Sequence, residues 1–264
     1  MRILFFGDIV GRIGREAVSS LLPKLVKEYG IDFIIANGEN ASHGKGLTEK
    51  NYQEIIASGV NVITLGNHWH AKDQIDEYID EADGLIRPLN LLSYTHGVGS
   101  AVYDCDGFEI RVTNLLGQAF MSETVASPFV SLSELVKNEP TAIHIVDFHA
   151  DSTSEKQIMG YAFAGKVTAL VGTHTHVQTN DARILEGGTA FISDIGMCGA
   201  YDSVIGFEKN SVMDKILFGK EGHFEIDDAA KPIVNAVVID VDEETGKALA
   251  VFPLSYLEGK PLHA

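Results

Sequence analysis

The chain has 264 residues, of which 45% are hydrophobic and 22% are charged, and this composition excludes a disordered protein. Its 37 acidic and 20 basic residues leave a formal net charge of −17. Duplex nucleic acid and acidic membranes are therefore disfavoured as partners, and an anionic ligand needs a local source of positive charge.

Short apolar runs alternate with helical patterns in the first quarter of the chain. Residues 3–6, 33–36 and 62–65 predict buried strands, and residues 12–29 and 48–58 predict the helices between them. Strands that alternate with helices are typical of a parallel sheet. For this part of the chain we expect such a sheet with helices on both faces.

Three hairpins follow in the remainder of the chain. The first is predicted around Asp106-Gly107, the second around Gly187-Gly188 and the third around residues 244–246. Between the first two, residues 142–146 and 169–171 read as strands and residues 154–164 as a helix. The whole pattern indicates a mixed sheet, or a pair of sheets, with helices outside.

The organisation of the chain indicates one cytoplasmic domain. No linker-like or low-complexity stretch divides it, so we expect residues 1–264 to form a single domain. Cys105 and Cys198 are too few for a disulfide framework. The apolar run at residues 3–6 is too short for a signal peptide or a membrane span. A homo-oligomer is compatible with the sequence.

Polar side chains follow five of the predicted strands, where ligands bind in α/β sheets. Each of the five loops carries a carboxylate, amide or imidazole group. In chain order these are Asp8, then Glu39 and Asn40, then Asn67 and His68, then His149, and last His174 and His176. Because the carboxyl ends of parallel strands lie at one edge of a sheet, we expect these five loops to meet.

These residue types indicate a metal centre. Imidazole, carboxylate and amide groups without thiolate suit iron, manganese or zinc. Seven candidate ligands, all of these residues except His68, are too many for one ion. Two ions about 3.5–4 Å apart that share a bridging carboxylate would use all seven, and Glu39 is the natural bridge. Two divalent ions would bring a charge of +4, against −2 from Asp8 and Glu39 and −1 from a bridging hydroxide. The centre would keep a charge of about +1, which would attract an anionic substrate.

The motifs resemble those of the calcineurin-like metallophosphoesterases. The residues concerned are Gly7-Asp8, Gly38-Glu39-Asn40, Gly66-Asn67-His68, His149 and the stretch 172–176. Residues 37–46, 147–149, 173–179 and 194–202 resemble more narrowly the bacterial YmdB-like branch. The resemblance implies a four-layered α/β/β/α sandwich of mixed β-sheets. It also implies a cyclic-nucleotide phosphodiesterase with a two-metal centre that often contains iron.

Carried over residue by residue, the resemblance assigns a role to each candidate. One metal would be held by Asp8, Glu39, Asn40 and His176, and the other by Glu39, Asn67, His149 and His174. A hydroxide bridging the metals would attack the phosphorus of a 2′,3′-cyclic or 3′,5′-cyclic nucleotide, and His68 would protonate the leaving oxygen. The chain departs from the broader superfamily at Val10, where a histidine is usual, and at Glu39, where an aspartate is usual. His70 receives no role.

Two other functions fit part of the pattern. Gly7, Gly11 and Gly14 after the first strand suggest a dinucleotide-binding domain, although their spacing is not that of the usual fingerprint. A metal-binding regulatory protein with little turnover is the second alternative. His68 argues against that alternative, because a site that only binds metal does not need a proton donor beside it.

Overall fold

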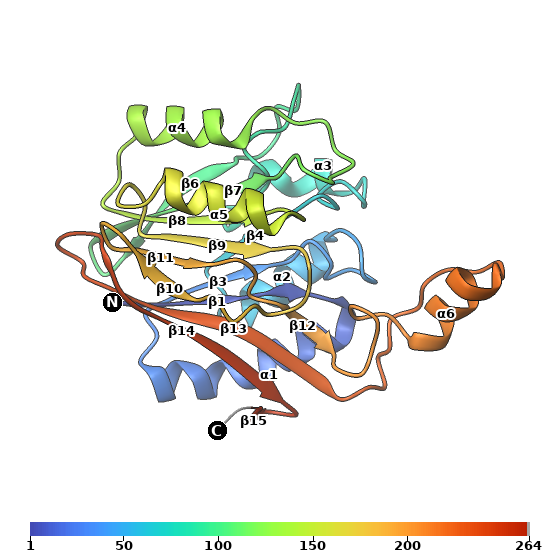
Figure 1. The fold of residues 1–264 in the computed structure, drawn as a ribbon. Helices are drawn as coiled ribbons and strands as arrows, with labels where there is room; N and C mark the ends of the chain where they lie inside the picture. Colours follow the sequence, from blue (N-terminus) through green and yellow to red (C-terminus); the bar gives the residue numbers. More distant parts are fainter. Residues whose placement is uncertain (263–264) are drawn as a thin grey trace.

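Two mixed β-sheets face each other between outer helices in this computed structural model, which describes residues 1–262 (Figure 1). The nine-stranded sheet contains β1 (Arg2–Phe6), β2 (Asp8–Ile9), β3 (Phe33–Asn37), β4 (Val62–Thr64), β5 (Leu85–Ile86), β12 (Met197–Ala200), β13 (Pro232–Val241), β14 (Ala248–Leu257) and β15 (Lys260–Pro261). Its main path runs β15-β14-β13-β1-β3-β4-β5, with β12 pairing β13 and β2. The strands β1, β3, β4 and β5 are parallel neighbours.

The second sheet has six strands in the order β10-β11-β9-β8-β7-β6. Its strands are β6 (Ser100–Cys105), β7 (Phe108–Leu116), β8 (Ile143–His149), β9 (Ala169–Thr173), β10 (Arg183–Leu185) and β11 (Thr189–Ile192). The helices are α1 (Gly11–Tyr29), α2 (Glu49–Ala57), α3 (Ile75–Tyr78), α4 (Pro128–Asn138), α5 (Thr153–Ala162) and α6 (Lys209–Phe218), with a 3₁₀ turn at Ile79–Glu81. No helix of the described residues is both long and apolar enough to cross a membrane.

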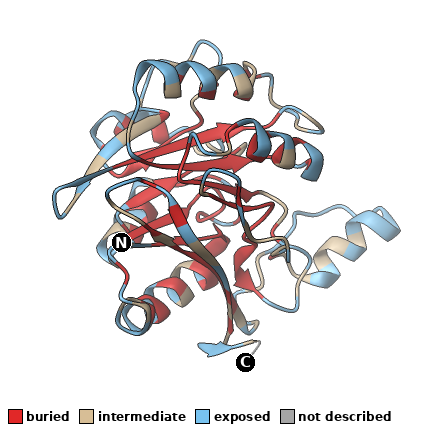
Figure 2. Ribbon diagram, turned by 60° about the vertical axis from the view of Figure 1, so that its left-hand side comes forward, coloured by how far each residue is buried: buried red, intermediate tan, exposed pale blue. Residues whose placement is uncertain are grey.

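The alternation of side chains along β1 explains the layers. Leu4 and Phe6 belong to an apolar cluster with Leu21 of α1, on the helix side of the sheet. Ile3 and Phe5 belong to a second cluster with strands of the six-stranded sheet. Successive side chains of a strand point to opposite faces, so β1 is buried on both. Figure 2 shows this burial through both sheets and the exposed outer faces of the helices.

The prediction of the α/β/β/α sandwich is confirmed. The prediction that helices cover both faces of one parallel sheet is wrong. The α1 and α2 helices share a core cluster with one face of the nine-stranded sheet, and the other face packs on the second sheet. A strand buried on both faces has the same apolar sequence whether a helix or a sheet covers it. The prediction of a single domain for residues 1–264 stays a prediction.

All three predicted hairpins are present. The pairs β6–β7, β10–β11 and β13–β14 are antiparallel. In the first hairpin Asp106 and Gly107 both have positive φ, as a tight turn between twisted strands requires. The sequence patterns missed α6, which has no buried residue and projects from the body in Figure 1.

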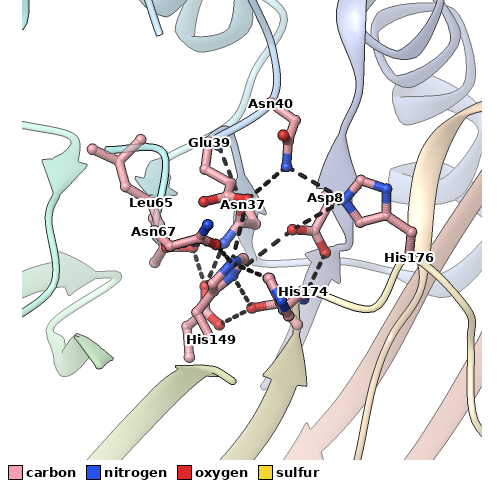
Figure 3. Close-up of polar contacts among 12 residues, drawn as sticks. Asp8, Asn37, Glu39, Asn40, Leu65, Asn67, His149, His174 and His176 are labelled. Carbon is pink, nitrogen blue, oxygen red and sulfur yellow. Dashed lines mark hydrogen bonds and ion pairs between the residues drawn. The ribbon is translucent and has the colours of Figure 1, made fainter. Parts of the chain in front are cut away.

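The topology brings two sets of strand ends together. In the first sheet β1, β3 and β4 run parallel, and in the second β7, β8 and β9 do so. The sheets face each other across a shared apolar core. Loops from both sheets therefore reach a common region at the carboxyl ends of these strands, which is where Figure 3 lies.

Candidate metal centre

The candidate ligands converge from both sheets, as expected (Figure 3). Asp8 begins β2, Glu39 and Asn40 follow β3, and Asn67 follows β4. From the second sheet come His149, the last residue of β8, and His174 and His176, which follow β9. Two of these residues lie in strands and not in loops as expected, because β8 continues to His149 and Asp8 begins the short strand β2.

Glu39, His149 and His174 offer a group of potential metal-binding atoms that all lie within 4.8 Å of one another. The Nε2 atom of His149 lies 3.3 Å from Glu39 Oε1 and 3.0 Å from His174 Nδ1. The side-chain oxygen of Asn67 is 3.0 Å from the same Nε2. Glu39, His174 and Asn67 thus all approach His149 Nε2, and these four residues are the members of the second predicted ligand set.

The Asp8 and His176 side chains form the other half of the site. Asp8 is fully buried, and its Oδ1 atom has no hydrogen-bond partner among residues 1–262. This atom lies 3.8 Å from His149 Nδ1 and 4.0 Å from His176 Nε2. A buried carboxylate oxygen without a donor costs free energy, and a cation would satisfy it. The residues present therefore fit a metal ion.

Asn40 lies between the two halves of the site. Its amide nitrogen donates to Glu39 Oε1 at 2.7 Å and is 3.4 Å from His176 Nε2. Its amide oxygen instead faces His68 Nδ1 at 3.2 Å. Asn40 would therefore have to rotate its amide to bind a cation through oxygen. Glu39 contacts His149 directly, and Asn40 links it to His176 in the other half.

Burial and close charges shift the pKa values of this cluster strongly. Burial raises the pKa of Asp8 to about 6, against the opposing effect of His176 and His149. Burial acts to raise the pKa of Glu39 as well, but His149 and His68 hold it well below its usual range. Burial lowers the pKa of His174 to about 3, with help from the neighbouring His149. Perturbed groups of this kind concentrate at functional sites.

A buried chain of hydrogen bonds sets the tautomer of His149. Thr173 Oγ1 donates to Asp147 Oδ1 at 2.7 Å and lies 2.8 Å from His149 Nδ1. Since its own hydrogen is used on Asp147, the Thr173 oxygen accepts from Nδ1. The nitrogen of His149 that remains for the site is Nε2, which faces Glu39 and His174. Asn37 donates to the other oxygen of Asp147 at 3.0 Å.

His176 is oriented by a backbone carbonyl. Its Nδ1 atom donates to the carbonyl oxygen of Ile205 at 2.9 Å, so its lone pair is on Nε2, toward Asp8. An imidazole that ligates a metal usually has its other nitrogen hydrogen-bonded in this way. In both His149 and His176 it is therefore Nε2 that faces the site and would bind a metal once it is free of its proton.

A buried ion pair supports the loop that carries His174 and His176. Both histidines have left-handed backbone, with φ of 105° and 66°, a conformation that costs free energy. Asp194 accepts the Thr175 N–H at 2.9 Å and pairs with Lys156 at 2.8 Å, and both side chains are buried. Asp194 begins the stretch 194–202 that resembles a family motif, but the sequence predicted no role for Asp194 or Lys156.

His68 lies at the pocket beside these groups. The pocket has a volume of about 280 Å³, and its lining includes Glu39, Asn40, His68, His174, His176 and Lys45. The backbone N–H of His68 donates to Glu39 Oε2 at 2.9 Å. By contrast His70, to which we assigned no role, pairs with the exposed Asp76 at 2.9 Å.

The glycine-rich start of the chain serves packing. A Cβ on Gly7 would lie 1.9 Å from the carbonyl oxygen of Gly196, and one on Gly14 would lie 2.2 Å from that of Cys198. These glycines therefore let the first loop and α1 approach β12 closely. Because packing explains them, they no longer indicate a dinucleotide-binding domain. Val10, where the superfamily has histidine, is buried in an apolar cluster with Met197.

The fold and the donor set together define a metallophosphoesterase-like protein. A calcineurin-like phosphoesterase of Bacillus subtilis, 13% identical in sequence, shares the fold with a TM-score of 0.51 over 98% of this chain and 90% of that chain. This likeness concerns the fold, and the group of Glu39, His149 and His174 could hold a metal ion within it.

Residues 4–254 match the model of the YmdB-like protein family, and the chain belongs to that family. It is 43% identical over 253 residues, 95% of each chain, to the 2′,3′-cyclic-nucleotide 2′-phosphodiesterase of Bacillus subtilis. It is 39% identical to a protein from Mycoplasma pneumoniae described as a novel phosphatase. The crystal structure of that protein gives a TM-score of 0.92 over 99% of this chain and 95% of that chain. The family resemblance expected from the motifs is confirmed.

Proposed function

We propose that the protein is a phosphodiesterase that hydrolyses 2′,3′-cyclic nucleotides at a centre of two metal ions. The observation that carries this proposal is that two neighbouring groups of donor atoms, one around Asp8 Oδ1 and one around His149 Nε2, lie beside a pocket that Glu39 lines. The Bacillus subtilis relative supports the choice of substrate. Hydrolysis of 3′,5′-cyclic nucleotides is a second activity that the same centre would allow.

The donor atoms divide into two sets. Asp8, Glu39, Asn40 and His176 would hold one ion, and Glu39, Asn67, His149 and His174 the other. Imidazole with oxygen donors and no thiolate favours iron, manganese or zinc. When bound, two such ions act as Lewis acids toward the phosphoryl oxygens and lower the pKa of water from about 15.7 toward 7.

The positive centre also explains how an acidic protein accepts an anion. The net charge of −17 repels a phosphodiester over most of the surface. Asp8 and Glu39 are the carboxylates of the donor set, so two divalent ions leave a local excess of positive charge. Lys45 at the pocket adds one more cation. A small phosphodiester therefore reaches the centre more readily than a duplex.

His68 is the proton donor in this proposal. Glu39 Oε1 faces His68 Nδ1 at 3.3 Å, so this carboxylate holds a hydrogen on that nitrogen. The Nε2 atom has no hydrogen-bond partner among the described residues, and the side chain lines the pocket. A water molecule supplies the oxygen that bonds to phosphorus, and a proton on Nε2 passes to the ribose oxygen as the P–O bond breaks. The proton that this water releases restores the ring, so one water is consumed for each diester.

The test is a panel of phosphodiesters assayed with metal-loaded protein. We expect turnover of 2′,3′-cyclic nucleotides, and the 3′,5′-cyclic and linear diesters in the panel define the range of substrates. Absence of turnover on every diester, with metal bound at full occupancy, would favour the regulatory alternative. Tight binding of a nicotinamide dinucleotide without metal would contradict the proposal altogether.

A further inference from the structure

A strained tight turn lies at the edge of the pocket. Val204 and Phe207 exchange two backbone hydrogen bonds, at 2.9 and 3.0 Å, and so enclose Ile205 and Gly206. Both enclosed residues have positive φ, 50° and 99°. This geometry resembles a type I′ turn, whose first central position is usually occupied by asparagine, aspartate or glycine.

Isoleucine is a costly residue at that position. A β-branched side chain with left-handed backbone is strained, and Ile205 does not offset the strain by burial, because 47% of it is exposed. The hydrogen bond to His176 comes from the backbone carbonyl, so any residue at this position could provide it. The turn and the orientation of His176 therefore do not explain why the side chain is isoleucine.

The place of Ile205 in the pocket offers an explanation. Among the described residues that line the pocket, Ile205 and Phe207 are the only two with large apolar side chains. Phe207 packs so closely over Gly44 that a Cβ there would lie 3.0 Å from its ring, and it also contacts the ring of Phe224. One wall of a polar pocket is thus firmly apolar.

We propose that Ile205 is a specificity-determining residue, whose side chain packs against the nucleobase of the substrate. This inference rests on the proposed function. The phosphate of a cyclic nucleotide requires the polar end of the pocket, and the flat face of its base is the part that an apolar wall can recognise. Strain that persists at a binding site without benefit to folding is consistent with such a role.

The test is Ile205→Asn, which suits the turn and keeps the carbonyl that orients His176. We expect KM for adenosine 2′,3′-cyclic phosphate to rise about tenfold, from the loss of part of an isoleucine contact. The kcat/KM for 1-O-methylribose 2′,3′-cyclic phosphate, which lacks a base, should stay unchanged. Because the strain is relieved, the melting temperature should not fall. Ile216→Asn, on the exposed α6, is the matched control, and its kinetics should equal those of the wild type.

Two results would overturn the inference while leaving the proposed function intact. One is an unchanged KM for the nucleotide in Ile205→Asn, and the other is an equal loss of kcat/KM with both substrates. If wild-type protein with metal bound hydrolyses neither substrate, the proposed function fails and the inference fails with it.

Discussion

At the scale of single residues, the local sequence indicated which side chains meet but not how each is oriented. Glu39, His149 and His174 could be named because each follows or ends a strand. The hydrogen bond from His149 to Thr173 and the chain onward to Asp147 join residues of two strands. Such a contact depends on strand register, which the strand patterns alone did not specify. The metal-ligand and proton-donor roles themselves stay predictions.

Replacement of His68 by alanine should preserve metal binding and lower kcat by about 10²–10⁴-fold, as expected when a general acid is removed. The two quantities are measured by elemental analysis and steady-state kinetics. His70→Ala is the control, because His70 is a neighbouring histidine that pairs with exposed Asp76. Full activity of the His68→Ala protein would remove His68 from the mechanism.

Thr173→Val should weaken metal binding by about 10–100-fold, as is typical for a residue that orients a ligating histidine. Valine has nearly the same shape as threonine but cannot accept the hydrogen of His149 Nδ1. Calorimetric titration of metal-free protein with Mn²⁺ measures the effect. An unchanged dissociation constant would show that Thr173 does not set the tautomer.

At the scale of elements, periodicity predicted α1, α2 and α5, the buried strands and the three hairpins, and it missed α4, α6 and the shortest strands. The α6 helix is short and buries no residue, and its apolar side chains Met213, Ile216 and Leu217 are exposed, so no packing against the core marks it as a helix. The β2 strand has only two residues and exists because it pairs with β12. The loop after β9 is not extended, so its histidines could not be oriented from a strand pattern.

That loop provides a prediction about stability. Lys156→Met leaves Asp194 buried without its cation, and we expect the free energy of unfolding of metal-free protein to fall by about 3–5 kcal/mol. Urea denaturation measures this loss. Lys209→Met, which removes a cation from the exposed pair with Asp202, should leave stability unchanged. Equal effects of the two substitutions would show that the buried pair does not hold the loop.

At the scale of the whole molecule, the composition and the order of elements predicted the α/β class, and the motif resemblance added the four layers. The sequence pattern could not show by itself which layer covers each face of β1, since both faces are equally apolar. The charge of the whole chain also contrasts with the chemistry of its centre. An acidic exterior surrounds a centre whose donor groups are arranged for cations.

The buried His144 should make the stability of metal-free protein depend on pH. Burial lowers its pKa to about 3 from an ordinary value of 6.5, with help from Arg111. Between these values the unfolded chain binds a proton that the native state excludes, so stability falls as pH falls below 6.5. At pH 4 the loss should reach about 3 kcal/mol. Parallel urea titrations of wild type and His144→Gln check this, and identical pH profiles for the two proteins would contradict it.

The most direct test of the two-metal centre is the number of ions bound per chain, measured by elemental analysis after loading with Mn²⁺ and removal of free metal. We expect about two ions in the wild type and a large loss in Glu39→Gln, since a bridging carboxylate serves both ions. A wild-type protein that binds one ion at saturation, or a Glu39→Gln protein that retains two, would contradict a bridged pair at this site.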